Sequence, residues 1–421
     1  MQNRPVYIVG GMRTPFVKSM TNYFEVTTQK LMTDTIEALV RKYALAGQRV
    51  GDVALGGVMI GSNWNLAREC VLGTSLHPDT PGYNVQRACG TSLETTWQLA
   101  MKIAAGQIES AIAGGVDSNS DLPVMASQGM TRKLLELNRQ KDFAGRLKTI
   151  LRFRPSDLAP DFPQVREPRT GLSMGQHCER MVQEWQISRA DQDQLAFESH
   201  QKGAKAYSEG FYKDLVMEYE GLKADGLLRP DTSIEKLAKL KPAFDFTGKG
   251  TLTAGNSTAL TDGASCVLLA SKEECDRRGW TPLARFIDAE SAAVDFVGGE
   301  GLLMAPAVAV PRMLKRNNLR LQDFDLYEIH EAFAGQVLCT LKAWQSPDFF
   351  NKYGLGEPIG TIDRNKMNVK GGSVALGHPF GATGTRIVAT LAKALKERGG
   401  GRGLISICTA GGMGVTAIVE A

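Results

Sequence analysis

Cys89 lies in the segment QRACGTS, directly before an apolar spacing that predicts a helix. Backbone N–H groups at the start of a helix favour a thiolate, so the sequence predicts a lowered pKa for this thiol. A thiolate there could attack a carbonyl carbon, and the same amides could hold the resulting acyl oxygen. Taken alone, a cysteine before a helix is more often a small buried residue than a nucleophile.

His378 lies in GGSVALGHPFGATG, where five glycines allow tight turns at the entrance to a helix. Such a loop presents its side chain, and a histidine is the usual general base for a thiol because its ordinary pKa is near neutrality. The loop could instead bind phosphate, but it matches neither the P-loop nor the dinucleotide-binding glycine pattern. Phosphate binding is therefore the weaker interpretation.

Cys408 and His330 each end an apolar segment, in GLISIC and YEIHEAFAG respectively. Both segments read as strands, and open α/β sheets bind their ligands at strand ends. Two cysteines and two histidines at such junctions favour acyl transfer through a thioester on Cys89. Metal binding is the rival interpretation, but the four residues lack the close spacing of metal ligands.

The composition is that of an ordinary globular protein: 421 residues, 43% hydrophobic, 22% charged and a net charge of +4. This charge argues against nucleic-acid binding over the whole surface. The seven cysteines form no C-x-x-C pair, which favours a reducing cytosol. No apolar run approaches the roughly 20 residues of a membrane span. A strand-like segment near the N-terminus leaves no room for a signal peptide, so we expect a cytoplasmic protein.

Alternating strands and helices must position the four residues. Period-2 and helical patterns predict strands at 6–11, 54–62 and 110–118, with helices around 32–40 and 93–104 between them. The far end repeats the order, with a strand that leads into a helix over 326–335, a helix around 387–395 and a strand at 403–412. This alternation predicts a duplicated α/β unit with a mostly parallel sheet covered by helices on both faces.

Residues 120 to about 250 lose this alternation and read as an insertion. Within it, residues 132–154 carry eight basic and two acidic residues and place Phe143, Leu147, Ile150 and Leu151 on one helical face. One interpretation is a solvated helix that covers the mouth of the active site. The other is a surface for anionic lipid or a partner subunit.

Several motifs together resemble the thiolase family nearly end to end: RACGTS, HEAFAG, GGSVALGHPFGATGTR and CTAGGMG, with GMRTPF and TAGNSTALTDGAS in support. The resemblance implies an α/β thiolase fold, in which two duplicated βαβαβαββ halves form a five-layered αβαβα architecture with an inserted loop domain. It implies an N-terminal half from 1–120 and 251–276, a loop domain at 121–250 and a C-terminal half at 277–421.

The resemblance also implies roles. Cys89 would carry the acyl group, His378 would activate it, and Cys408 would exchange protons with the acetyl-CoA carbon. His330 and His378 would hold the enolate oxygen, and the backbone N–H groups of Cys89 and Ala410 would form a second oxyanion site. Two further positions, Met174 and Thr258, match residues that line the substrate path of relatives. No cofactor or metal is implied, since CoA and acyl-CoA are substrates.

Many thiolases have Asn at the position of His330, whereas the His form resembles the thiolase subunits of fatty-acid oxidation complexes. The expected reaction is therefore cleavage of 3-ketoacyl-CoA by CoA in β-oxidation. The expected assembly is a homodimer or dimer of dimers, with a hydratase/dehydrogenase partner subunit and peripheral contact with the inner membrane through 132–154. Three alternatives remain: an acetoacetyl-CoA thiolase working in either direction, a ketoacyl synthase, and a catalytically silent lipid-binding or scaffold subunit.

Overall fold

One mixed ten-stranded sheet runs through the computed structural model, which describes residues 4–61, 65–163 and 165–421. The strand order is β10-β11-β12-β9-β1-β8-β5-β3-β4, and β2 pairs with β8. In chain order the strands are β1 (Val6–Arg13), β2 (Val17–Lys18), β3 (Asp52–Leu55), β4 (Gly82–Asn84), β5 (Ser110–Asp117), β8 (Thr261–Ser271), β9 (Ala284–Ala293), β10 (Leu326–Ile329), β11 (Arg402–Thr409) and β12 (Met413–Glu420).

The prediction of a mostly parallel sheet is wrong. Parallel pairing is confined to β10 with β11 and to β3 with its two neighbours, whereas the central pairs from β11 through β5 are antiparallel. Strands β8 and β5 are buried at every residue. A strand covered on both faces has a continuous apolar sequence whatever its direction, so the sequence pattern does not report the direction.

The strand predicted over 54–62 is also too long. It corresponds to β3, which ends at Leu55, and its last predicted residue, Ser62, lies outside the described residues. Gly56 follows the strand, and a Cβ there would come within 1.9 Å of the Val85 carbonyl oxygen. The chain therefore leaves the sheet where two backbone segments approach closely.

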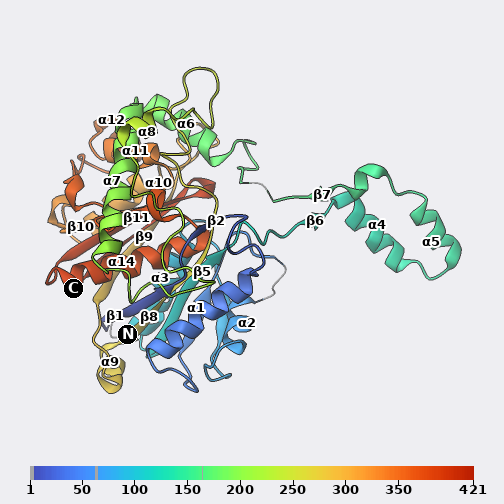
Figure 1. Cartoon of the computed structure of the whole chain (residues 1–421), viewed down its shortest axis with the longest axis horizontal. Helices are drawn as coiled ribbons and strands as arrows, with labels where there is room; N and C mark the ends of the chain where they lie inside the picture. The colour runs from blue at the N-terminus through green and yellow to red at the C-terminus, as the bar shows by residue number, and fades with distance from the viewer. Residues whose placement is uncertain (1–3, 62–64, 164) are drawn as a thin grey trace.

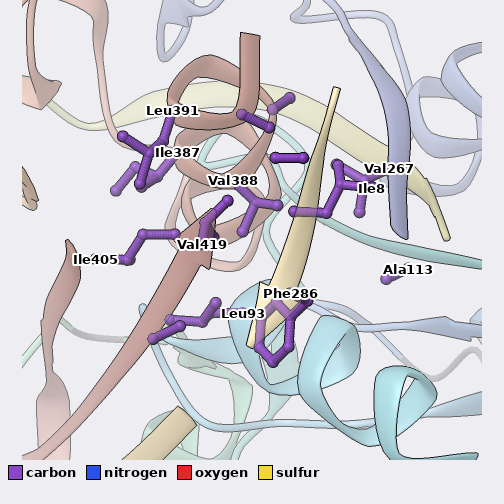
Figure 2. Close-up of a cluster of buried hydrophobic side chains, with 14 of the residues drawn as sticks. Ile8, Leu93, Ala113, Val267, Phe286, Ile387, Val388, Leu391, Ile405 and Val419 are labelled. Carbon is purple, nitrogen blue, oxygen red and sulfur yellow. The ribbon is translucent and has the colours of Figure 1, made fainter. Parts of the chain in front are cut away.

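Three helical layers alternate with the strands of the two halves, which confirms the predicted five-layered architecture. The middle layer holds α3 (Thr91–Ala104) and α14 (Thr383–Glu397), and Figure 2 shows their side chains packing with those of strands from both halves. The outer layers hold α1 (Thr28–Lys42) and α2 (Leu66–Leu72) on one side, and α10 (Ala305–Arg316) and α11 (Ala334–Ala343) on the other. The remaining helices of the body are α6 (Met174–Glu184), α7 (Arg189–Ser208), α8 (Ile234–Ala238), α9 (Lys272–Arg278), α12 (Pro347–Tyr353) and α13 (Ser373–Leu376).

The two central helices touch at their N-terminal ends. A Cβ at Gly384 would lie 2.2 Å from the backbone nitrogen of Leu93, so only glycine allows this approach. Ser92 Oγ accepts the backbone N–H of Thr385 at 2.9 Å. Since Cys89 lies just before α3 and His378 just before α14, this contact brings the two loops together.

The basic segment 132–154 belongs to a projecting hairpin of two helices, α4 (Gln128–Arg139) and α5 (Phe143–Ile150). It is joined to the body through the short paired strands β6 (Met125–Ala126) and β7 (Pro160–Asp161). We call residues 124–162 the arm, which Figure 1 shows extending away from the body. The segment is not one helix, because Asp142 caps the start of α5 by accepting the backbone N–H of Gly145 at 2.7 Å.

None of the helices in the described ranges is long and apolar enough to cross a membrane. The insertion predicted at 121–250 contains the arm and helices α6 to α8. The exact boundaries of the three predicted domains stay a prediction.

Candidate active site

Cys89 occupies a short turn between β4 and α3. The Thr91 hydroxyl donates to the carbonyl oxygen of Ala88 at 2.7 Å and accepts the backbone N–H of Arg87 at 2.9 Å. Ala88 adopts a left-handed φ of +43°, which is unusual for a residue with a side chain. The turn leaves Cys89 half-buried, at the wall of a cavity.

The prediction of a lowered thiol pKa is wrong. Burial raises the pKa of Cys89 to about 12, and the nearby carboxylates of Asp117 and Glu167 act in the same direction. The backbone N–H groups of Ala410 and Cys89 approach the sulfur and oppose this rise, but desolvation of the thiolate outweighs them. The resting side chain is therefore a neutral thiol that needs a base.

Cys408 lies near the end of β11 and is 1% exposed. The turn Ala410–Gly412 follows, with Gly411 at a φ of +76°. Burial raises the pKa of Cys408 well above its ordinary value, and the neighbouring Cys89 adds to the rise. The second thiol is thus also protonated at rest and stands beside the first.

His330 and His378 face one another, with ring centroids 4.2 Å apart. His330 follows β10 and donates its backbone N–H to the Ser406 carbonyl oxygen on β11 at 2.8 Å. The His378 ring contacts that of Phe380 at 5.3 Å, and Phe380 lines the same cavity as Cys89. The structure therefore gathers all four residues singled out in the sequence.

Both imidazoles are neutral at physiological pH. Burial lowers the pKa of His378 to about 3, with a further contribution from the positive charge of Arg386. Burial also lowers the pKa of His330 well below its ordinary value, aided by His378 and Arg386. A neutral imidazole can accept the thiol proton as the sulfur attacks, so the site suits proton-coupled nucleophilic attack.

A cavity of about 400 Å³ borders Cys89. Met174 lines it, together with Val58, Met59, Phe380, Ala410 and Met413. Of the described residues that line this cavity, none belongs to the arm. Coverage of the mouth of the site by the basic segment stays a prediction. Thr258 is not among those lining residues either; its hydroxyl donates to the Ala332 carbonyl oxygen at 3.1 Å.

A second cavity, of about 270 Å³, borders the loops that carry the histidines. Its wall includes Ser257, which pairs with Phe333 in the HEAFAG segment, and Ala259, which precedes the residue that pairs with His378. Three charged side chains also line it: Arg229, Lys236 and Asp231, of which Lys236 and Asp231 form an ion pair at 2.9 Å. Among the described residues of its wall, the positive charge of Arg229 is therefore left for an anionic ligand.

Sequence reasoning missed two buried charged residues. Glu167 lines the Cys89 cavity and accepts the backbone N–H of Gly411 at 2.6 Å; no motif marked this acid within the insertion. Arg386 ends the motif GGSVALGHPFGATGTR and is 2% exposed. A lone arginine beside the apolar stripe of the helix that contains Ile387 was a signal that could have found it.

Models of two thiolase domains match the chain: the thiolase N-terminal domain over residues 6–273 and the thiolase C-terminal domain over 280–421. Among curated proteins, a 3-ketoacyl-CoA thiolase of Shewanella sp. (strain W3-18-1) is 40% identical over 423 residues, covering 99% of this chain and 96% of the relative. A 3-ketoacyl-CoA thiolase of Yersinia enterocolitica is also 40% identical, covering 100% and 97%.

Solved thiolase structures superpose over the whole chain. Human mitochondrial 3-ketoacyl-CoA thiolase in complex with CoA has a TM-score of 0.82 at 28% identity, covering 100% of this chain and 98% of that one. The Bacillus anthracis acetyl-CoA acetyltransferase has a TM-score of 0.82 at 30% identity, with coverage of 100% and 99%. The fold is the thiolase fold, and the chain belongs to the thiolase family.

Proposed function

We propose that this acyltransferase is a 3-ketoacyl-CoA thiolase, which uses CoA to cleave 3-ketoacyl-CoA into acetyl-CoA and a shortened acyl-CoA in fatty-acid β-oxidation. The observation that carries the proposal is the meeting of two neutral thiols and two neutral imidazoles at a centre where Cys89 and Phe380, which contacts His378, line one cavity. Two proton-carrying thiols suit a reaction that must both form a thioester and protonate a carbon.

In the first half-reaction, His378 takes the thiol proton of Cys89 as the sulfur bonds to the 3-keto carbon. The bond between carbons 2 and 3 then breaks, and its electron pair forms the enolate of acetyl-CoA. Cys408 gives its proton to carbon 2, which completes acetyl-CoA. The backbone N–H groups of Cys89 and Ala410 hold the tetrahedral oxyanion, a position supported by their approach to the Cys89 sulfur.

In the second half-reaction, free CoA replaces acetyl-CoA. The Cys408 thiolate takes the proton of the CoA thiol, and the CoA sulfur attacks the acyl carbon. The bond from that carbon to Cys89 breaks, and Cys89 recovers its proton from His378. Acid and base return to their starting states, so one set of residues serves both steps.

CoA is a substrate, and we place it in the second cavity. Its phosphates suit the positive charge of Arg229, with Lys236 already paired to Asp231, while its long uncharged arm suits the apolar wall formed by Leu227 and Leu237. The acyl chain then occupies the Cys89 cavity, whose methionines Met59, Met174 and Met413 adapt to chains of different length.

The alternative within the family is an acetoacetyl-CoA thiolase that works in either direction. Thiolysis of 3-ketoacyl-CoA substrates of 4, 8 and 16 carbons separates the two. We expect activity on all three lengths, whereas activity on the C4 substrate alone would favour the alternative. The variant Cys89→Ala is the control; if it matched the parent, Cys89 would not be the nucleophile.

A catalytically silent lipid-binding or scaffold subunit is a further alternative. Retention of both thiols and both imidazoles in one buried centre argues against it. In a subunit without catalytic activity, any of these four residues could be replaced without loss of function. Acylation of the protein by a 3-ketoacyl-CoA, followed by mass spectrometry of the Cys89 peptide, tests this directly, since a silent subunit would take up no acyl group.

We propose a homodimer or a dimer of dimers, associated with a hydratase/dehydrogenase subunit. Among the described strands β4 ends the sheet, and its outer edge can be extended by a second copy. Light scattering of the purified chain, alone and with that subunit, measures both assemblies. A monomer at micromolar concentration would contradict the first.

We further propose a cytoplasmic enzyme whose arm makes peripheral contact with an anionic inner membrane. The supporting observation is a set of apolar side chains exposed among the arm's cations: Met125, Leu134, Leu135, Phe143, Ile150, Leu151, Leu158 and Phe162. Exposed apolar side chains flanked by Lys and Arg suit the surface of an anionic bilayer.

Co-sedimentation with vesicles of phosphatidylcholine, with or without phosphatidylglycerol, tests this contact. Neutralising the basic residues of 132–154 should abolish binding to anionic vesicles. The matched control neutralises Lys205 and Lys223, which are exposed on the body, and should bind as the parent does. Equal binding by all three proteins would refute the proposal.

A further inference from the structure

A buried hydrogen-bonded chain ends at His330. Arg386 lies on α14, and its guanidinium Nη2 donates to Ser373 Oγ at 2.6 Å. The same Oγ lies 2.9 Å from His330 Nδ1. All three residues are buried, and the Glu328 carboxylate lies 3.6 Å from Arg386 Nη1. The charged side chain of Arg386 is thus linked to the His330 ring through two successive hydrogen bonds.

The chemistry of Arg386 fixes the direction of the first hydrogen bond and favours one direction for the second, because the Ser373 hydroxyl has no other acceptor among the described residues. A guanidinium has five N–H donors and no acceptor, so Ser373 Oγ must accept from it. The hydroxyl proton of Ser373 is then free to point at His330 Nδ1, which accepts it. A neutral imidazole that accepts at Nδ1 carries its proton at Nε2.

His330 Nε2 is buried, and no residue in the described part of the chain lies within hydrogen-bonding distance of it. Buried N–H groups are rarely left unpaired in folded proteins, so a donor in this state is suited to a ligand oxygen. We propose that Arg386, acting through Ser373, positions His330 as the Nε2–H tautomer, so that the ring donates to the thioester oxygen of the departing acetyl-CoA. This inference rests on the proposed thiolase function.

The positive charge of Arg386 has a second effect, which also keeps His330 neutral. Arg386 lowers the pKa of His330 and of His378, alongside the larger effect of burial. A neutral His330 in one tautomer is a fixed donor that needs no reorganisation when the enolate forms. We therefore regard Arg386 and Ser373 as positioning residues, since neither needs to touch the substrate.

Ser373→Ala is the informative variant, because it removes the hydroxyl between Arg386 and the ring. Ser406→Ala is the matched control: Ser406 is a buried serine on the strand that accepts the His330 backbone N–H, and its own hydroxyl is unpaired within the described residues. Ser373→Thr restores the hydroxyl and should restore the parent behaviour. Thermal unfolding of each protein verifies that it folds.

The first readout is the tautomer itself. Nitrogen-15 NMR of histidine-labelled protein resolves the five histidines of the chain, and His330→Asn assigns the signal of interest. We expect protonation at Nε2 in the parent, in Ser406→Ala and in Ser373→Thr, and loss of that preference in Ser373→Ala. Protonation at Nδ1 in the parent would overturn the proposal.

The second readout separates the half-reactions. Exchange of the acetyl-CoA methyl protons with deuterated water needs the enolate to be stabilised, whereas alkylation of Cys89 by iodoacetamide does not. We expect Ser373→Ala to slow exchange about 10-fold to 100-fold and to leave alkylation unchanged. Equal slowing by Ser406→Ala, or no slowing by Ser373→Ala, would contradict the positioning role.

The two proposals can fail separately. A parent enzyme that thiolyses no 3-ketoacyl-CoA refutes the proposed function, yet the NMR measurement still tests the tautomer. A double variant, Arg386→Met with Glu328→Gln, removes the charge without leaving a buried carboxylate unpaired. In this double variant His330 should also lose its preference for the Nε2–H tautomer. If the preference remained, Ser373 alone would set the tautomer, and Arg386 would have no positioning role.

Discussion

The catalytic centre buries its side chains, whereas the arm exposes them to solvent. In the centre, His330 and Cys408 are each 1% exposed, and buried hydrogen bonds fix the surrounding loops. On the arm, Phe143 is 80% exposed and Leu151 is 77% exposed. The difference separates two tasks: the centre needs groups with fixed protonation, whereas the arm presents apolar and basic groups to something outside the molecule.

The two regions are nevertheless connected along the chain. The segment that returns from the arm carries Glu167, whose carboxylate accepts the backbone N–H of Gly411 in the turn after Cys408. This bond joins residues that are 244 positions apart in the sequence. The comparison therefore predicts large effects from changes at the centre, intermediate effects at Glu167 and small effects on the arm.

The largest effect is expected from Cys408→Ala, which removes the acid that we propose for protonation of the acetyl-CoA carbon. We expect kcat for thiolysis to fall about 10³-fold, since general acid–base groups contribute this much. Steady-state kinetics with a C8 substrate measures it. Cys339→Ala is the control, because Cys339 is an equally buried thiol in the outer core of the C-terminal half, and activity near that of the parent is expected. A similar fall in kcat in both variants would show that Cys408 has no chemical role in the reaction.

A second large effect concerns pH. Because burial raises the pKa of Cys89 to about 12, the thiol is protonated throughout the neutral range, and its thiolate fraction rises as pH rises toward that value. The rate of alkylation by iodoacetamide should therefore increase about tenfold per pH unit between pH 6 and 9. Alkylation quenched at fixed times and quantified by mass spectrometry gives the dependence of the rate on pH. A rate independent of pH would instead indicate a preformed thiolate–imidazolium pair.

The sequence singled out candidate site residues where the chemistry lies in local motifs. Cys89, His378, Cys408 and His330 each mark the end of a strand or the start of a helix, and the thiolase fold gathers such ends. The sign of the Cys89 pKa shift was missed, because desolvation depends on burial by segments distant in sequence. The antiparallel directions of the central strands were missed for a similar reason: helices α1, α3 and α14 pack on β8, which is buried at every residue, and a continuous apolar run does not report strand direction.

Pairs of residues that act through hydrogen bonds across long sequence separations were also beyond the sequence. Ser373 lies 43 positions from His330, and only the folded chain joins them. The same holds for Glu167 and Gly411. Positions of this kind carry no chemistry of their own, so their residue type gives no sign of their role until a partner is known.

Glu167 is expected to show an intermediate effect, since it links the arm's return segment to the centre. Glu167→Ala removes the acceptor for Gly411 and should lower kcat about tenfold by loosening the turn that holds Ala410. Glu167→Gln keeps an acceptor oxygen and should restore most of this loss. Because the Glu167 charge raises the pKa of Cys89, the Gln variant should also lower that pKa and speed alkylation. An equal kcat in the parent and in both variants would show that Glu167 does not contribute to catalysis.

The smallest effect is expected on the arm, and one substitution made in both regions measures the contrast. Leu391→Ala opens the central core between the two halves, where the side chain is 1% exposed, and should cost about 3 kcal/mol in the free energy of unfolding. Leu151→Ala removes the same atoms from the exposed arm and should cost under about 0.5 kcal/mol, with thiolysis of a C4 substrate unchanged. Denaturant unfolding and steady-state kinetics report the two quantities. A large stability loss from Leu151→Ala would mean that the arm packs against the body in solution, and the separation of the two regions would fail.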